Sequence, residues 1–500
     1  MKVLSTSQMY DADQATMNNL AISSIDLMEK AAGKCSDWIL NRYKNFGGVF
    51  HVVCGVGNNG GDGLVISRIL LQNEQKVKTY IIPFSKNESS DFKVNLIRIR
   101  ELGHDPEYLT DENRHISCSS DDLVVDAIFG LGLSRPPAGL SKSIIQSINR
   151  SGATIVSIDF PSGLFSEDSV QDEESVIRAN HCLTFQNPKL AFLLPENQEF
   201  IENWSILDIG LDKGFITGLP SQYTLIDQGF IRNVFQRRAK FSHKGSFGHS
   251  LLIGGSFGKI GAMVLASRAA LCAGSGLVSS YIPKCGYTVL QTANPEVMVE
   301  VDDENYIQFF NYKTIPDAVG IGPGLGMHLK TKKGFIKYIS SLNIPLVLDA
   351  DALNILSEHE ELLTLIPENS ILTPHPKEFE RLAGSWNDDF DKLKKQQNFA
   401  KSYRCTVVLK GAHTSITQGD VIYFNNSGNP ALATAGSGDV LTGIITGLLA
   451  QGYASFEAAI LGVYLHGRAA DHAIKSKSSE ESFTAMDGIH FLGTSFKEIY

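Results

Sequence analysis

The sequence predicts an α/β protein of two domains, and three observations support this fold class. The chain has 500 residues, more than a single hydrophobic core usually accommodates. Short apolar runs of strand length alternate with helical patterns, which is typical of parallel sheets covered by helices. The alternation starts again in the second half with different loops, so we expect a second sheet there.

The first half contains apolar runs that we interpret as buried strands. They cover residues 49–57, 77–83, 122–130, 153–160 and 181–188. Helical patterns such as residues 64–73 lie between them, so the predicted sheet is parallel and doubly wound. Ligands of such sheets bind at the carboxyl ends of the strands, and we therefore look for functional residues where the strands stop.

The second half repeats this organisation. Its predicted strands cover residues 249–256, 317–324, 345–352, 369–375 and 405–412, and long helical patterns follow at 261–274 and 439–451. Residues 211–230 have mixed periodicity and several turn residues. We place the domain boundary there, near Pro220, which predicts domains at 1–220 and 221–500.

The composition narrows the classes of function. Hydrophobic residues make up 43% of the chain and charged residues 20%, as in globular proteins. The formal net charge of -10 argues against a nucleic-acid or anionic-membrane surface, but not against a local basic pocket. Seven scattered cysteines without a C-x-x-C pair indicate reduced thiols. Neither a signal region in residues 1–17 nor an apolar run of ~18 residues is present, so we expect a cytoplasmic protein.

The stretch GVGNNGGDG, residues 55–63, raises the first functional question. Its glycines fit the G-x-G-x-x-G fingerprint of dinucleotide-binding folds, but a dehydrogenase also needs an acid at the end of the next strand. That strand ends at Ile82, Pro83 and Phe84. Asp62 inside the loop would also repel a pyrophosphate. The oxygens of Asn58, Asn59 and Asp62 instead suit hydroxyls, amides or a hard cation.

Two further acids follow predicted strands of the first half. Asp126 precedes a glycine-rich loop, and Asp159 lies in SIDFPSG with Ser162 close behind. Each of these residues alone is more often a helix or turn cap. Acids at successive strand ends on one side of a sheet favour a functional cluster over three separate caps.

The first half resembles the NAD(P)H-hydrate epimerase family over residues 1 to about 215. The resemblance rests on LMEKAAG (27–33), GNNGGDGL, the stretch from Asp126 to Pro136, and SIDFPSG. It implies a Rossmann-like fold that interconverts the R and S epimers of hydrated NADH or NADPH, which carry a hydroxyl at ring carbon 6. The substrate is then a damaged nicotinamide dinucleotide and not a redox cofactor.

The resemblance also implies residue roles. Asp159 would contact the reacting ring, and a potassium ion would be bound by Asn59, Asp126 and Ser162. The substrate would be held by Asn58, Asn59, Gly60, Gly61 and Asp62 and wrapped by Gly130, Leu131, Gly132, Leu133, Ser134, Arg135 and Pro136.

The strongest motif of the second half is ATAGSGDVLTG, residues 433–443. Gly436 and Gly438 open the backbone directly before a helix, which creates an anion hole from amide groups and the helix dipole. Asp439 at the helix start can take a proton from a hydroxyl that attacks a phosphate. The plain alternative is an aspartate that caps the helix.

Other strand ends of the second half carry further candidates. Lys410 can contact a nucleotide phosphate, and Glu378 can orient a hydrated magnesium ion. His375 alone is more often a loop hydrogen-bonder, and Gly324 allows a ligand to approach closely. Asp349, Asp351 and Asn354 are either polar site residues or the start of the next helix.

The stretch GGSFGK, residues 254–259, offers a rival interpretation. It is not a Walker A loop, because its glycine spacing is one residue short and Ile260 replaces the required Ser or Thr. It does match G-x-S-x-G, so Ser256 could be the nucleophile of a serine hydrolase with His466 or His472. That interpretation leaves the motifs at 410–414 and 436–439 without a role.

The second half, over about 240–500, resembles the ribokinase-like fold and more closely the ADP/ATP-dependent NAD(P)H-hydrate dehydratase family. The resemblance rests on residues 243–256 and 261–278 and on GPGLG, LDADALN, TPHPKEFERL, LKGAHT and AGSGD. It implies substrate contacts from Ala262, Gly324, His375 and Asp439. It implies adenine-nucleotide contacts from Lys410, Gly411, Ala412, His413, Thr414 and Gly438.

Together the two resemblances imply successive steps of one repair pathway. The S epimer would be dehydrated at the expense of ADP, or of ATP, with Mg²⁺, giving AMP and phosphate from ADP. A homo-oligomer is expected. A vitamin or sugar kinase of the same fold and a non-catalytic nucleotide sensor remain as alternatives.

Overall fold

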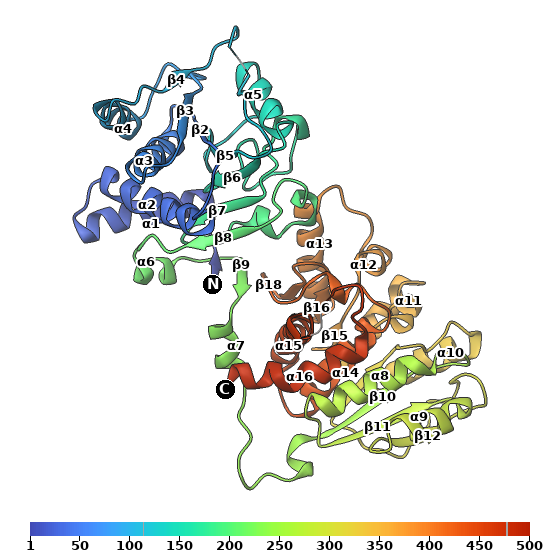
Figure 1. The fold of residues 1–500 in the computed structure, drawn as a ribbon. Helices are drawn as coiled ribbons and strands as arrows, with labels where there is room; N and C mark the ends of the chain where they lie inside the picture. Colours follow the sequence, from blue (N-terminus) through green and yellow to red (C-terminus); the bar gives the residue numbers. More distant parts are fainter. Residues whose placement is uncertain (114, 477–478) are drawn as a thin grey trace. The chain divides into compact units, whose positions relative to one another are not determined.

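The computed structural model of the chain describes residues 1–113, 115–476 and 479–500. It divides into two compact units, one formed by Lys2–Ser221 and the other by Met1 with Gln222–Tyr500. Each unit contains its own sheet (Figure 1). The predicted fold class, α/β with two sheets, is confirmed.

The sheet of the first unit is parallel throughout, in the order β4-β3-β2-β5-β6-β7-β8. Its strands are β2 (Phe50–Cys54), β3 (Val77–Ile81), β4 (Glu107–Tyr108), β5 (Leu123–Ala127), β6 (Thr154–Ile158), β7 (His181–Phe185) and β8 (Trp204–Leu207). A short strand, β1 (Lys2–Val3), precedes the first helix. The short strands β4 and β8 are not among those predicted.

Helices cover both faces of this sheet, as a parallel sheet requires. The helices are α1 (Thr6–Leu20), α2 (Ser24–Arg42), α3 (Asn58–Gln72), α4 (Ser90–Glu101), α5 (Leu140–Asn149) and α6 (Lys213–Gly218). Successive strand residues face opposite sides: Val52 joins the core under α2 to α4, whereas Val53 packs with isoleucines of α5. Figure 1 shows α3 and α5 on opposite sides of the strands.

The glycine-rich stretch after β2 is itself the beginning of α3, which starts at Asn58. Its glycines let this helix lie directly on the sheet. A Cβ on Gly60 would lie 1.9 Å from the carbonyl oxygen of Gly55, and one on Gly63 would lie 2.7 Å from Cys54 Sγ. Larger residues would lift the helix away, so the glycines place Asn58, Asn59 and Asp62 at the sheet edge.

The sheet of the second unit runs in the order β9-β18-β17-β16-β15-β14-β13-β10-β11-β12. Only β16–β17 and β17–β18 pair in antiparallel fashion. The strands are β9 (Tyr223–Ile226), β10 (His249–Ile253), β11 (Leu277–Ile282), β12 (Met298–Val301), β13 (Ala318–Ile321), β14 (Leu346–Leu348), β15 (Ile371–Leu372), β16 (Thr406–Leu409), β17 (Ser415–Gln418) and β18 (Val421–Asn425). The sequence analysis missed β9, β11, β12, β17 and β18.

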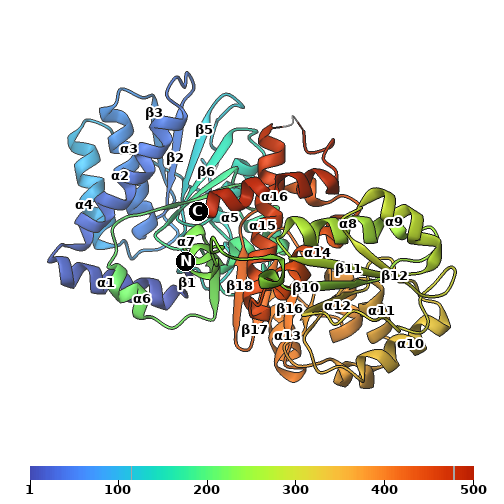
Figure 2. The same ribbon diagram turned by 90° about the horizontal axis from the view of Figure 1, so that it is seen from below.

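Helices also cover both faces of the second sheet. They are α7 (Gln228–Val234), α8 (Ile260–Cys272), α9 (Tyr287–Ala293), α10 (Leu329–Ile339), α11 (Asp351–Leu356), α12 (Pro376–Ala383), α13 (Asp389–Ser402), α14 (Ser437–Ala450), α15 (Ser455–Ser476) and α16 (Ala485–Ile499). Figure 2 shows α8 and α9 on one side of the strands and α10 to α12 on the other. Among the described residues, no helix has the length and apolar character needed to span a membrane.

Candidate active sites

A cavity of about 780 Å³ opens at the carboxyl edge of the first sheet. Residues after β2, β5 and β6 line it together with residues of α1 and α2. The predicted site residues in its lining are Asn58, Asn59, Asp62, Gly130, Leu131, Gly132, Leu133, Ser134, Arg135, Pro136 and Asp159.

Two predicted substrate residues do not line this cavity. Gly60 and Gly61 are buried, and a Cβ on Gly61 would lie 2.8 Å from Met28 Sδ. Gly60 packs against the backbone of Gly55 and Gly61 packs against Met28. These two glycines therefore have a packing role.

The proposed cation ligands meet beneath the cavity, around the backbone of Phe129. Asn59 Nδ2 donates to the Phe129 carbonyl oxygen over 2.9 Å, and the Phe129 N–H donates to Ser162 Oγ over 2.8 Å. Asp126 is fully buried. Its Oδ1 accepts from Ser162 Oγ at 2.5 Å, and its Oδ2 accepts from Ser157 Oγ at 2.7 Å. The fold therefore brings Asn59, Asp126 and Ser162 together, as the sequence predicted.

Burial raises the pKa of Asp126, and the hydrogen bonds from Ser162 and Ser157 oppose that rise. The Asp126 carboxylate also accepts from the Ser162 N–H over 2.9 Å, so it organises the loop after β6. The turn-cap alternative for Asp126 thus describes part of its role. The oxygens gathered here are amide, carboxylate, hydroxyl and carbonyl groups, a hard-donor set that suits an alkali cation.

Asp159 ends β6 in a backbone conformation that aspartate seldom adopts. Its φ is +61°, in the left-handed region, and such strain costs on the order of 1–3 kcal/mol and concentrates at functional sites. Its Oδ1 accepts from the Phe185 N–H over 3.1 Å. Lys189 Nζ lies 3.5 Å from the same oxygen, and the Lys189 side chain is only 2% exposed. The Asp159 side chain therefore lies beside a buried lysine.

The structure adds residues to this site that sequence reasoning missed. Tyr10 and Asp13 of α1 line the cavity beside Asp62 and Asp159. Burial, strengthened by the charge of Asp159, raises the pKa of Asp13 to about 6. Burial and the charges of Asp159 and Asp13 raise the pKa of Asp62 well above its usual range. The i, i+3 spacing of Tyr10 and Asp13 indicates that both side chains lie on one face of a helix. The spacing does not indicate which part of the protein that face contacts.

In the second unit, Asp439 lies in the first turn of α14. Gly436 precedes the helix with φ +85°, and a Cβ on Gly438 would lie 3.5 Å from Lys410 Nζ. The glycines therefore leave the helix N-terminus open beside a cation. Burial, with the charge of Asp349, raises the pKa of Asp439 to about 6, while Lys410 opposes this rise.

Lys410 is held among carboxylates at the end of β16. Its Nζ lies 3.0 Å from Asp349 Oδ1 and 4.0 Å from Glu378 Oε2. Thr442 Oγ1 donates to Asp349 Oδ2 over 2.7 Å, which ties Asp349 to α14. Burial works against the charged form of Lys410, but Asp349 and Glu378 outweigh it and raise its pKa. Asp349 is thus a polar residue of the site.

His375 and Glu378 cap α12 in a reciprocal arrangement. The His375 N–H donates to Glu378 Oε2 over 2.8 Å, and the Glu378 N–H donates to His375 Nδ1 over 3.3 Å. Burial lowers the pKa of His375, which favours the neutral ring. The hydrogen-bonding alternative weighed for His375 therefore describes part of its role.

The remaining predicted residues lie on two loops and on α8 of the second unit. Gly324 has φ +61°, and its Cβ would lie 3.3 Å from that of Ala262, so these two predicted substrate residues meet. At 410–414, Thr414 Oγ1 donates to the Gly411 carbonyl oxygen over 3.0 Å and closes a tight turn. Gly411 and Ala412 are exposed in this turn, and His413 and Thr414 are half-buried.

The serine-hydrolase alternative lacks its catalytic geometry. Ser256 Oγ donates to the Gly324 carbonyl oxygen over 2.8 Å. His466 Nε2 instead lies 3.3 Å from Ser437 Oγ, and His472 pairs with Glu498. In the described part of the chain no histidine forms a hydrogen bond with Ser256, so the G-x-S-x-G match does not form a nucleophile elbow.

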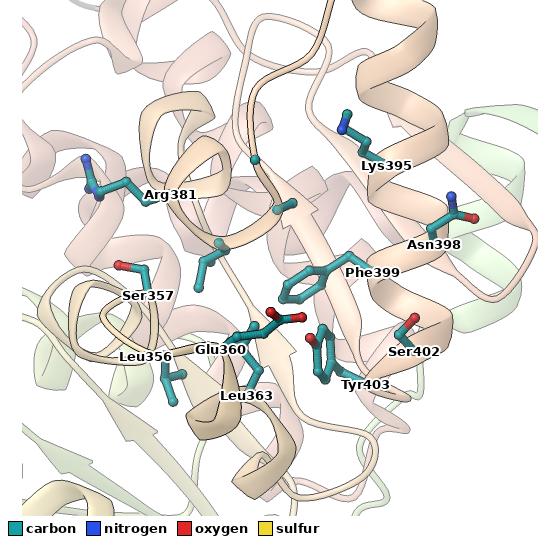
Figure 3. Close-up of a pocket in the computed structure, with 13 residues that line it drawn as sticks. Leu356, Ser357, Glu360, Leu363, Arg381, Lys395, Asn398, Phe399, Ser402 and Tyr403 are labelled. Atoms are coloured by element: carbon teal, nitrogen blue, oxygen red, sulfur yellow. The ribbon is translucent and has the colours of Figure 1, made fainter.

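A separate cavity of about 470 Å³ lies among α11, α12 and α13 (Figure 3). None of the predicted site residues lines it. Figure 3 shows its two basic residues, Arg381 and Lys395, on opposite sides, and Arg381 Nη2 donates to Asn354 Oδ1 over 2.7 Å. Its basic groups do not converge, so this cavity is not a second anion site.

Comparisons with known proteins agree with this division of the chain. A family model described as the YjeF-related protein N-terminus matches residues 24–191, and one described as NAD(P)H-hydrate dehydratase matches residues 250–488. The curated bifunctional NAD(P)H-hydrate repair enzyme Nnr of Moorella thermoacetica is 34% identical over 98% of this chain and 96% of its own. The protein of the same name from Dictyoglomus turgidum is 30% identical over 100% and 99%.

A solved structure supports the fold of the second unit. A ribokinase-like superfamily protein from Enterococcus faecalis V583 is similar to 56% of this chain and 98% of its own, with 26% identity and a TM-score of 0.50. The expected ribokinase-like fold is therefore confirmed.

Proposed function

This chain belongs to the family of bifunctional NAD(P)H-hydrate repair enzymes, and from that premise we propose which reaction each of its two sites catalyses. Residues 1–220 interconvert the R and S epimers of hydrated NADH or NADPH. Residues 221–500 dehydrate the S epimer at the expense of ADP, giving AMP and phosphate. One observation carries this proposal: each matched region has its own carboxylate, Asp159 or Asp439, at the carboxyl edge of its own sheet.

For the first site we propose that the 780 Å³ cavity holds the hydrated dinucleotide. Asn58, Asn59 and Asp62 would bind its polar groups, and the loop from Gly130 to Pro136 would enclose it. Asp159 would face the reacting ring. A potassium ion held by Asn59, Asp126 and Ser162 would keep the loops after β5 and β6 in place, which is the contribution that a bound alkali cation makes.

For the second site we propose that Asp439 takes the proton of the ring hydroxyl. The hydroxyl oxygen then attacks the terminal phosphorus of the nucleotide, and the amides around Gly436 and Gly438 stabilise the charge on the transferred group. Phosphate leaves with the electron pair of the carbon–oxygen bond. A proton leaves the neighbouring ring carbon and restores the dihydropyridine.

The other residues of the second site position the two substrates in this proposal. Ala262, Gly324 and His375 would contact the hydrated ring. Lys410, Gly411, Ala412, His413, Thr414 and Gly438 would contact the adenine nucleotide. The oxygen donors of Glu378 suit a hydrated Mg²⁺, which would neutralise phosphate charge when bound. We also propose ADP rather than ATP as donor, a homo-oligomer and a cytoplasmic location.

A vitamin or sugar kinase of the same fold would stop after phosphoryl transfer. The whole-length relatives named for hydrate repair disfavour that alternative. The two reactions also differ in their products, because a kinase leaves a stable phosphate ester while repair restores the near-ultraviolet absorbance of the dihydronicotinamide ring.

The proposal is tested by two substitutions, each the control for the other. Asp439→Asn keeps the shape of the side chain but removes the base, which usually costs on the order of 100-fold or more. This variant should lose dehydration of the S epimer and still equilibrate R and S. Asp159→Asn should repair S at a near-normal rate and leave R to its slow spontaneous epimerisation.

Progress curves on mixed epimers with ADP distinguish these cases. The Asp159 variant should stop after a fast phase that consumes only S. If Asp439→Asn leaves ADP-dependent repair intact, or Asp159→Asn abolishes repair of pure S epimer, the assignment of the two sites is wrong.

A further inference from the structure

Helix α1 forms one wall of the cavity in the first unit. Met9, Tyr10 and Asp13 of this helix line the cavity. Tyr10 Oη lies 3.0 Å from the position of a Cβ on Gly132, so the helix reaches the loop proposed to enclose the substrate. Asp13 therefore faces the same space as Asp159, which enters it from β6.

The two carboxyl groups have opposite surroundings. Lys189 Nζ is fixed by the carbonyl oxygens of Phe185 and Asn187, over 3.0 and 3.1 Å, and lies 3.5 Å from Asp159 Oδ1. This arrangement holds a buried lysine beside Asp159. Asp13, in contrast, makes no hydrogen bond or ion pair with another described residue, and the carboxylate of Asp159 disfavours a second negative charge beside it.

Burial and two neighbouring charges act on the Asp13 carboxyl. Burial and the Asp159 charge raise the pKa of Asp13 to about 6, while Lys189 opposes them. The groups that line the cavity with it are Tyr10, Asp62, Arg135 and Asp159. A carboxyl with a raised pKa that shares a cavity with a carboxyl beside a buried lysine is an arrangement that can supply an acid and a base.

We propose that Asp13 is a further catalytic residue of the first site, the acid that protonates the departing ring hydroxyl while Asp159 acts as the base. This proposal rests on the function proposed above for that site. Inversion at ring carbon 6 needs one bond to break and to form again on the other face of the ring. Two carboxyl groups that enter one cavity from different elements can serve the two faces.

The reaction begins at the hydroxyl of ring carbon 6. Asp13 gives its proton to the hydroxyl oxygen, and the carbon–oxygen bond breaks with its electron pair on oxygen, which releases water. The lone pair of the ring nitrogen forms a nitrogen–carbon double bond and leaves a planar cation. Water adds from the opposite face, the double-bond pair returns to nitrogen, and Asp159 takes the extra proton. Exchange with solvent resets both carboxyl groups.

Asp62 does not fill this role in the proposal, although it lines the same cavity. Its side chain is only 8% exposed, and burial raises its pKa well above its usual range. Burial therefore favours its protonated form, which can donate a hydrogen bond to the substrate. Asp13 is half-buried, so it can exchange its proton with water after each turnover.

The test measures epimerisation of pure R epimer by the full-length chain, corrected for the spontaneous rate. Asp13→Asn should lower the rate about 100-fold, the usual effect of losing a general acid, while dehydration of S stays unchanged. Asp11→Asn is the matched control, because Asp11 is exposed on the same helix and does not line the cavity. Asp13→Glu should recover part of the rate.

Two measurements on the unaltered chain keep the test independent of how the variants fold. The epimerisation rate should fall as pH rises above about 6, because the acid then loses its proton. In water enriched in the heavy isotope of oxygen, each inversion should place the label on ring carbon 6. If the carbon–nitrogen bond opened instead, inversion would outrun labelling and the proposed step would be wrong.

The outcomes separate the two proposals. If the unaltered chain does not epimerise the hydrate at all, the proposed function of the first site fails and the role of Asp13 falls with it. If the unaltered chain epimerises but Asp13→Asn keeps the same rate and pH profile, only the acid role is overturned.

Discussion

The role proposed for Asp439 as the base of the second site predicts a measurable dependence of the rate on pH. Burial and the charge of Asp349 raise the pKa of Asp439 to about 6, because both disfavour the ionised carboxylate. A general base must be ionised to accept a proton, so the rate should fall as pH drops through this pKa. A carboxyl with an ordinary pKa would place the fall near pH 4.

The size of the effect follows from a single titration. With a pKa of about 6, roughly nine tenths of Asp439 is ionised at pH 7 and roughly one tenth at pH 5. We therefore expect kcat for dehydration of pure S epimer at saturating ADP to fall about tenfold between these values. The assay follows the recovered absorbance of the dihydronicotinamide ring, with a blank lacking enzyme at each pH.

The fall of the rate at low pH forms the acidic limb of the pH profile. Two neighbouring charges should move this acidic limb in opposite directions. Asp349→Asn removes the anion that helps to raise the Asp439 pKa, so the limb should move to lower pH. Lys410→Met removes the cation that lowers it, so the limb should move to higher pH. An acidic limb that stays in place in both variants, or that lies near pH 4 in the unaltered chain, would refute the role of Asp439.

Two further predictions concern stability and the cation. Gly443→Ala should destabilise the second unit by about 1–3 kcal/mol, because its Cβ would lie 2.1 Å from the Ala266 carbonyl oxygen of α8. Thermal melting compares it with Gly493→Ala, whose Cβ meets nothing within 4 Å. Crystals grown with rubidium or thallium should show an anomalous peak among the three proposed potassium ligands, and a map without one would remove that site.

Much of the site chemistry could be read from single stretches of sequence. The strands 49–57, 122–130 and 153–160 were recognisable as apolar runs, and the residues after them meet at one edge because parallel strands all end on the same side. The structure joins Asn59 and Ser162 to the backbone of Phe129 and joins Asp126 to Ser162. It also gathers most of the predicted substrate residues in one cavity. Both outcomes follow from the position of these residues at or directly after the ends of strands in the sequence.

The elements that the sequence analysis missed have weaker local signals. β11 carries Ser279 and Ser280, which break its apolar run even though both are buried. β17 and β18 form an antiparallel hairpin with polar residues at its turn, whereas the predicted strands are apolar runs that alternate with helical patterns. Their pairing is decided by neighbours in the sheet and not by their own composition.

The sequence by itself determined that there are two sheets, which motifs end their strands, and that Asp159 and Asp439 lie in different halves of the chain. Only the tertiary structure decided that Asp13 of α1 faces Asp159, and that Lys189 is buried beside that carboxylate. The physical reason is that strand-end chemistry is encoded by residues adjacent in sequence. The pKa values of Asp13 and Asp439 instead depend on burial and on charges supplied by distant parts of the chain, which exist only once the elements pack.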